Sequence, residues 1–195
     1  FNIYAVELKT GLKNEDLLIY KKKSDNYPNA SVAILLDETY MDIEKDFSYT
    51  LKRRIVKKIL NYKGKKEHSE IKVFFDERYE SVNIEKAITV KEENDKYKVI
   101  KIDKNAIREI DAPFDSGNMH YAVHKMKVAA FSAVEEGDII DITYILKNSQ
   151  KKKIATETIF AGSEPIYTKK FTLSFWETQS PIINKRNWKG NFQIE

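Results

Sequence analysis

Apolar and polar residues alternate along much of the chain with the period of two that is typical of half-buried β-strands. Groups rich in Gly, Pro, Asn, Asp or Ser separate the alternating segments and predict turns. The segments predicted as strands are 31–40, 47–60, 71–75, 82–90, 97–102, 121–131, 139–146, 154–160 and 166–176. Many short strands with few helices predict a mainly β fold, with antiparallel strands in a two-sheet, sandwich-like arrangement and little helix.

The second of these segments fits two templates. Leu51, Ile55 and Ile59 share one face of a helix as well as one face of a strand. The β-branched side chains of Ile55, Val56 and Ile59 favour the strand only slightly. Periodicity alone therefore leaves both structures open between residues 51 and 60.

Two short segments predict helix. Residues 14–20 begin with Asn14, a residue type that caps helices, and a polar loop follows them at 21–29. We therefore assign residues 1–26 to a leader segment, which either packs on the domain as a short helix or is frayed from it. Residues 27–195 are assigned to a single β domain, because no repeat or low-complexity linker divides them. A further helical turn is predicted at 105–110.

The most complete hairpin pattern joins the segments 121–131 and 139–146. The connection contains Glu135, Glu136, Gly137 and Asp138. Gly137 is predicted to take a positive φ there, because glycine alone adopts that conformation without steric cost. A loop rich in turn formers precedes the hairpin at 111–118.

Composition narrows the possible chemistry. The 195 residues include no cysteine, which excludes thiolate nucleophiles, disulfides and Cys-ligated metals and leaves the compartment open. The 34 basic and 30 acidic residues give a net charge of only +4, which disfavours nucleic acid as a partner. No apolar run approaches the roughly 20 residues of a membrane span. Because the sequence begins at Phe1 rather than Met, we expect a mature or excised piece.

Histidine is the first candidate for metal binding. His120 and His124 are spaced as zinc ligands would be on a helix. In the predicted strand, however, a rise of ~3.3 Å per residue separates them by about 13 Å. No glutamate follows His120 directly, so the metalloprotease motif is missing too. We therefore predict no metal site and no cofactor.

Charged residues are plentiful but lie mostly in predicted turns. Paired carboxylates occur at 37–38, 76–77, 135–136 and at positions 138 and 141, and basic clusters occur at 21–23, 52–54, 57–58, 63–66 and 151–153. Glycoside hydrolysis would need two carboxylates about 5–10 Å apart across a cleft, a separation that sequence does not show. No nucleophile elbow or glycine-rich phosphate loop is present. Solvated charge is the simpler interpretation.

Aromatic residues near the end of the chain suggest either a core or a sugar-stacking platform. Phe171, Leu173 and Phe175 share one face of a predicted strand, which favours the core. Trp188 is the one aromatic residue that we retain as a candidate for ligand binding on the surface.

Four stretches, in this order and spacing, carry a family resemblance: YPNASVAILLDE (27–38), RIVKKILNYKG (54–64), FDERYESVNI (75–84) and FSAVEEGDII (131–140). From about Tyr27 to Trp176 the chain resembles the β domain of unknown function that precedes transglutaminase-like domains in bacterial proteins. The resemblance implies that residues 54–64 are a strand ending in a turn at Gly64, and that Gly137 forms the turn of a hairpin. Ser132 departs from the pattern, since the family often has proline there.

The resemblance implies a non-catalytic accessory or interaction domain of a larger protein, in an extracytoplasmic setting such as the periplasm or cell surface. Its expected partner is a transglutaminase-like domain in the same protein. That domain's Cys-His-Asp chemistry is absent from this sequence, so we expect no enzyme activity from the chain itself. The alternative is an independent glycan- or peptide-binding β module. An enzyme that acts through carboxylates ranks third.

Overall fold

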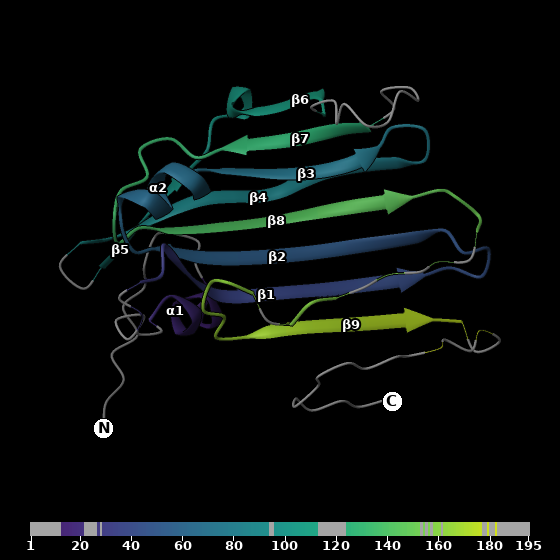
Figure 1. Cartoon of the computed structure of the whole chain (residues 1–195), viewed down its shortest axis with the longest axis horizontal. Coiled ribbons are helices and arrows are strands. Elements are labelled where there is room, and N and C mark those ends of the chain that lie inside the picture. The colour runs from purple at the N-terminus through teal and green to yellow at the C-terminus, as the bar shows by residue number, and fades with distance from the viewer. Residues whose placement is uncertain are drawn as a thin grey trace.

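A computed structural model describes residues 13–21, 27, 29–93, 96–112, 124–152, 154, 156, 158–160, 162–176, 179 and 182. Its strands form a six-stranded sheet, with the order β5-β4-β8-β2-β1-β9, and a three-stranded sheet, with the order β3-β7-β6 (Figure 1). The strands are β1 Val32–Ile43, β2 Tyr49–Ile59, β3 Glu70–Asp76, β4 Glu80–Glu93, β5 Lys96–Lys101, β6 Ile107–Asp111, β7 His124–Ala130, β8 Ile139–Asn148 and β9 Lys169–Phe175. The paired strands are antiparallel except for β1 and β9, which run parallel. The predicted mainly β, two-sheet fold is confirmed.

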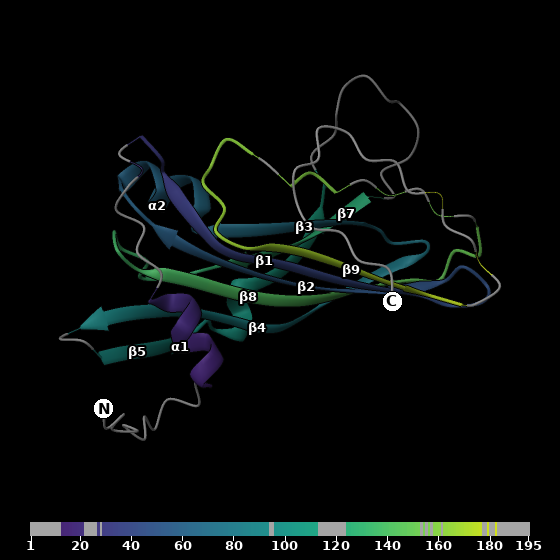
Figure 2. The same cartoon turned by 90° about the horizontal axis from the view of Figure 1, so that it is seen from below.

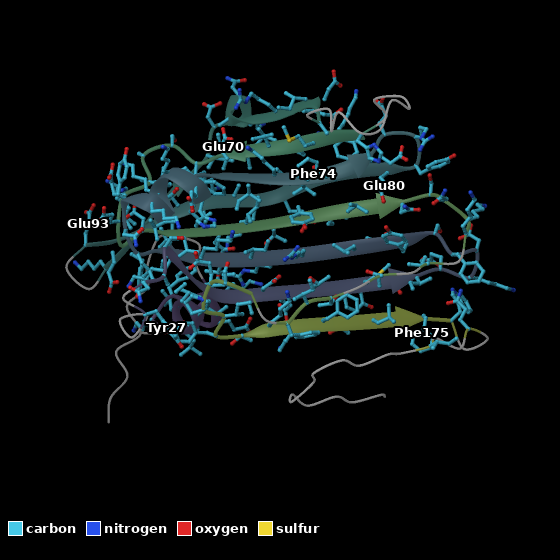
Figure 3. The ribbon with its side chains drawn as sticks, in the orientation of Figure 1. Tyr27, Glu70, Phe74, Glu80, Glu93 and Phe175 are labelled. Carbon is cyan, nitrogen blue, oxygen red and sulfur yellow. The ribbon has the colours of Figure 1, made fainter. Side chains whose placement is uncertain are left out.

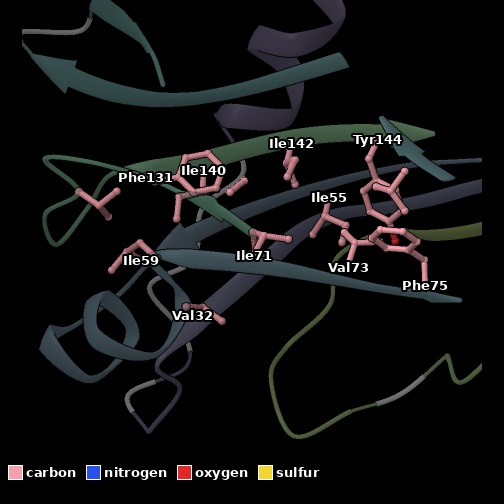
Figure 4. Close-up of a cluster of buried hydrophobic side chains, with 13 residues drawn as sticks. Val32, Ile55, Ile59, Ile71, Val73, Phe75, Phe131, Ile140, Ile142 and Tyr144 are labelled. Carbon is pink, nitrogen blue, oxygen red and sulfur yellow. The ribbon is translucent and has the colours of Figure 1, made fainter. Parts of the chain in front are cut away.

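The larger core lies between the two sheets (Figure 4). In β2, Ile55 and Ile59 point into this core, whereas Val56 between them points to the opposite face. Burial of both faces explains why β2 shows no clean alternation, since each face needs apolar residues. The ambiguous segment at 51–60 is therefore a strand, and residues 51–59 all pair with β1 or β8.

A second core lies on the other face of the six-stranded sheet and is covered by the helix α1, Asn14–Tyr20 (Figure 2). Tyr20 is buried there, in the same cluster as Leu35 and Val56. The predicted helix at 14–20 is confirmed, and it packs on the sheet. The predicted cap is wrong, because Asn14 is the first helical residue and Lys13 occupies the cap position. The Asp16 carboxylate accepts a hydrogen bond from the Lys13 amide at 3.2 Å instead.

A second helix, α2 (Tyr62–His68), was not predicted, and it corrects the assignment of Gly64 as a turn residue. The helix begins after Asn61, whose side chain accepts a hydrogen bond from the Gly64 amide at 3.0 Å. Gly64 is buried, and a Cβ added to it would lie 2.0 Å from the backbone oxygen of Ser31. Glycine is therefore needed for close packing of α2 on the start of β1, and not for a turn.

The predicted hairpin between 121–131 and 139–146 is wrong. Strand β7 pairs with β3 and β6 in the small sheet, whereas β8 pairs with β2 and β4 in the large one. The connection crosses from one sheet to the other, and Phe131 and Val134 within it are buried in the core between them. Gly137 has a φ of 89°, as predicted, and its amide donates to the Ile59 carbonyl at 2.9 Å.

Three smaller predictions also need correction. Residues 104–106 form a 3₁₀ turn, η1 (Lys104–Ala106), and residues 107–111, expected to be partly helical, form β6 because they pair with β7. The described residues of 154–160 form no strand. The strand expected at 166–176 begins only at Lys169, after an isolated bridge between Ile166 and Ile34. Residues 94–95, between the predicted strands 82–90 and 97–102, lie outside the described residues, and so does the loop expected at 111–118 from residue 113 onward.

Candidate interaction surface

The most deeply buried charge in the described part of the chain is Asp141 on β8, which lies under α1. Arg54 of β2 donates to both of its carboxylate oxygens, at 3.1 and 2.7 Å. The ammonium of Lys86 (2.8 Å) and the hydroxyl of Tyr20 (2.6 Å) also donate to Asp141. Asp16 of α1 completes the group by pairing with Arg54. Two carboxylates and two cations thus neutralise one another.

This network shifts the pKa of Asp141 and the pKa of Tyr20 in opposite directions. Burial would raise the pKa of Asp141, but Arg54, Lys86 and Tyr20 hold it below its ordinary value. Burial, followed by the charge of Asp141, raises the pKa of Tyr20. An ionised carboxylate that accepts from three donors has little capacity left to act as a base. We therefore interpret the network as an attachment of α1 to the sheet.

A second charged group lies on the opposite face of the same sheet. Arg53 donates to the two carboxylate oxygens of Asp37 at 2.8 and 3.0 Å, and Lys169 of β9 lies 3.0 Å from the same carboxylate. These cations outweigh the effect of burial and lower the pKa of Asp37. Nearby, burial and then Arg53 lower the pKa of Lys57, whose ammonium lies 3.4 Å from Nδ1 of His68.

The Glu164 carboxylate joins the connection before β9 to the start of β1. It accepts from the hydroxyl of Ser31 at 2.7 Å, and from the amides of Ser31 (3.2 Å) and Val32 (3.3 Å). The Ser31 hydroxyl is buried and donates to a carboxylate, so it is not placed as a nucleophile beside a histidine base. The arrangement holds two segments together.

A shallow pocket of about 460 Å³ lies at the end of the sandwich, where β8 ends near the β1–β2 and β3–β4 connections. Its central carboxylate, Glu80, accepts from the Asn148 amide at 2.9 Å, the Tyr49 hydroxyl at 3.3 Å and the Asp76 backbone amide at 2.8 Å (Figure 3). Glu44 and Glu77 also line this pocket, and the three hydrogen bonds hold the side chain of Glu80 in place.

The residues singled out in the sequence do not assemble into one site. His124 is exposed at the start of β7, whereas His120 and Trp188 lie outside the described residues. The carboxylate pairs expected to lie mostly in turns are divided among β1, the end of β3 with the β3–β4 connection, the β7–β8 connection, and β8, which carries Asp141. Within the part of the chain that the structure describes, no group of three His, Asp or Glu side chains is arranged to hold a metal ion. Nor does any described helix have the length and apolarity to cross a membrane.

The most unusual surface feature is an apolar row across the outer face of the three-stranded sheet, formed by Phe74, Met126 and Ile110. The register places Met126 of β7 directly opposite both Phe74 of β3 and Ile110 of β6, so all three side chains leave the same face. Phe74 is 57% exposed and Ile110 is 40% exposed, whereas Met126 between them is 6% exposed. Figure 3 labels Phe74 on its strand.

Charged residues border the apolar row on one side. In the next register position, Lys72 of β3 and Arg108 of β6 flank Val128 of β7. Glu70 lies 3.6 Å from Lys72 and 3.5 Å from Arg108, so these cations have an acidic partner on their own sheet. Two exposed apolar side chains, Phe74 and Ile110, beside a charged border are typical of a protein-binding surface.

The family model for DUF3857, a domain of unknown function with a solved structure, matches residues 45–188. The chain belongs to the DUF3857 family. A protein from Parabacteroides distasonis, described as a "putative protease", contains the same fold, with a TM-score of 0.65 and 15% sequence identity over 75% of this chain. This DUF3857 chain spans 29% of the length of that protein.

A second solved structure, the CBM3a-L domain of a scaffoldin from the Clostridium thermocellum cellulosome, covers 61% of this chain and 68% of its own at 10% identity. Its TM-score of 0.34 is too low to carry an argument. No curated protein matches the DUF3857 chain. The comparisons therefore establish the family and the fold.

The apolar row was not predicted from the sequence, although the outward orientation of Phe74 could have been. In the predicted strand 71–75, strict alternation places Ile71, Val73 and Phe75 on one face and leaves Phe74 on the other. Two consecutive phenylalanines in a two-faced strand thus indicate that one of them points away from the core. The alignment of Phe74 with Met126 and Ile110 depends on pairing between distant segments, which the sequence does not show.

Proposed function

We propose that this DUF3857 chain is a non-catalytic interaction domain of a longer bacterial protein, in which it supports or positions a neighbouring transglutaminase-like domain. The P. distasonis protein supports the first part, because there the same fold accounts for less than a third of a longer chain. The resemblance of four stretches to the domain that precedes transglutaminase-like domains supports the second. The apolar row is the observation that carries the proposal.

The apolar row has the properties of a docking surface. Phe74 and Ile110 lie in the middle and near the end of their strands, where a polar residue would be tolerated on a solvated face. Because Phe74 is 57% and Ile110 40% exposed, burying the exposed part of either side chain against a partner would contribute on the order of 1 kcal/mol. Since Lys72 and Arg108 already have an acidic partner, the surface does not require an acidic ligand. It fits the folded, apolar face of a neighbouring domain.

The absence of cysteine assigns any cysteine-based acyl transfer to another part of the parent protein. The buried carboxylates Asp37 and Asp141 are held ionised by cations that contact them directly, which suits attachment of elements better than proton transfer. Support and positioning of a neighbour is the function that remains for this chain.

The test is binding of the purified chain to the isolated neighbouring domain of its parent protein, measured by calorimetry. The double variant Phe74→Ser, Ile110→Ser should bind at least about tenfold more weakly, because it removes both exposed apolar side chains at the centre of the contact. The matched control is Tyr62→Ser, which removes an equally large side chain that is 68% exposed on α2. The control should bind like the wild-type chain.

Equal affinity of the wild-type chain and the double variant would refute the apolar row as the docking surface. A neighbouring domain without a Cys, His and Asp constellation would refute the transglutaminase part of the proposal. The non-catalytic part is tested separately, by assaying the chain alone against peptide, amide and glycan substrates. Turnover that persists through repurification and disappears after a single Asp, Glu or His substitution would refute it.

A further inference from the structure

The two edges of the six-stranded sheet are protected very differently. The edge strand β5 carries Lys96, Lys98 and Lys101 among its six residues. Lysine on an edge strand opposes pairing with another chain, because pairing would desolvate the charge. The other edge strand, β9, has lysine only at its first two positions, and no charge in the stretch Phe-Thr-Leu-Ser-Phe that follows (Figure 1). Most of β9 therefore lacks the charged side chains that protect the edge at β5.

The backbone of β9 has hydrogen-bonding groups directed away from β1. The Asp37 amide donates to the Thr168 carbonyl at 2.9 Å, which fixes the phase of the parallel ladder. Because alternate residues of a strand bond to opposite neighbours, the even-numbered residues of β9 face β1. The outward-facing residues are Lys169, Phe171, Leu173 and Phe175. No hydrogen bond joins their outward backbone groups to another described residue.

The side chains of this edge are only partly covered on the core-facing side. Phe171 lies beside Thr39 and Leu173 lies beside Met41, and both of these β1 residues are buried. Phe171 and Leu173 themselves are half-buried, and Phe175 is more exposed. A further strand alongside β9 would cover these apolar side chains and satisfy the outward backbone groups at the same time.

We propose that β9 pairs antiparallel with β9 of a second copy of the chain, about a twofold axis that passes through Thr172. This register pairs Lys169 with Phe175 and Phe171 with Leu173 of the other copy, so that every outward-facing residue of the strand gains a partner. It also keeps the lysines of the two copies at opposite ends, whereas parallel pairing would place them side by side. The dimer uses a different surface from the apolar row and goes beyond the proposed docking function.

Thr172 provides the decisive test, because the twofold axis places it opposite itself. Its side chain is exposed and its backbone groups face β1, so substitution leaves the fold intact. Thr172→Lys and Thr172→Glu should each be monomeric in sedimentation experiments, because like charges would meet in a close cross-strand pair. A mixture of the two variants should form a heterodimer. Thr172→Val is the matched control and should dimerise like the wild-type chain.

Each outcome decides the proposal. A wild-type chain that stays monomeric up to several hundred micromolar, or a dimer that persists in Thr172→Lys, would overturn it. Failure of the Lys and Glu variants to associate would overturn the register. Slow hydrogen exchange of the Leu173 amide in the Thr172→Lys monomer would show that another segment of the same chain covers the edge of β9. That result would also refute the proposed dimer. The double variant at Phe74 and Ile110 should dimerise normally, so this test is independent of the docking surface.

Discussion

Replacing Gly64 by alanine should destabilise the protein by about 2–4 kcal/mol, although alanine is the better helix former by about 1 kcal/mol. The new Cβ would lie 2.0 Å from the backbone oxygen of Ser31, and backbone atoms cannot rotate aside. Relief requires α2 to move away from β1 by about 1 Å or more, since carbon contacts begin near 3.5 Å. That shift strains the Asn61–Ala30 hydrogen bond at 3.0 Å and the Leu60–Ser31 hydrogen bond at 3.1 Å, worth about 1 kcal/mol each. Loss of packing between α2 and the start of β1 accounts for the remainder of the predicted destabilisation.

Urea unfolding followed by far-UV circular dichroism would measure the effect, with the free energy of unfolding compared between the variant and the wild type. Gly162→Ala is the matched control, because no atom lies within 4 Å of the Cβ it would add. The control should change the free energy of unfolding by less than about 0.5 kcal/mol. A Gly64→Ala protein that is more stable than wild type by about 1 kcal/mol, as helix propensity alone predicts, would refute the close-packing argument.

Two further predictions follow from the charged groups. Asp141→Asn should lower the free energy of unfolding by about 3 kcal/mol, because it leaves Arg54 and Lys86 without their buried carboxylate. A loss below about 1 kcal/mol in the same urea assay would contradict this prediction. Burial and then Lys57 lower the pKa of His68, so the unfolded chain binds a proton at a higher pH than the folded protein. The free energy of unfolding should therefore fall as the pH drops from about 6.5 toward the lower pKa of His68 in the folded state. His68→Gln should reduce this dependence of the unfolding free energy on pH. The same pH dependence in the variant would contradict the role of His68.

The sequence by itself determined the fold class and most of the strands, because side-chain period is a local property of the chain. Residues 71–75, 82–90 and 97–102 alternate clearly, and they lie in β3, β4 and β5, except that β5 ends one residue earlier, at Lys101. The helix at 14–20 and the positive φ of Gly137 were also visible locally, since both depend on a few adjacent residues. The charged clusters and the histidines were visible too, but their neighbours in space were not.

Only the tertiary structure decided which strands pair, because pairing joins residues far apart in the chain. Strands β7 and β8 look like a hairpin in sequence, yet the chain between them changes sheets and buries Phe131 in the core. Gly64 looks like a turn residue, yet the backbone of Ser31 packs where a Cβ would lie. The apolar row exists because pairing of distant segments aligns its side chains. The edge of β9 exists because its outward backbone groups have no hydrogen-bond partner among the described residues. No local pattern encodes either feature.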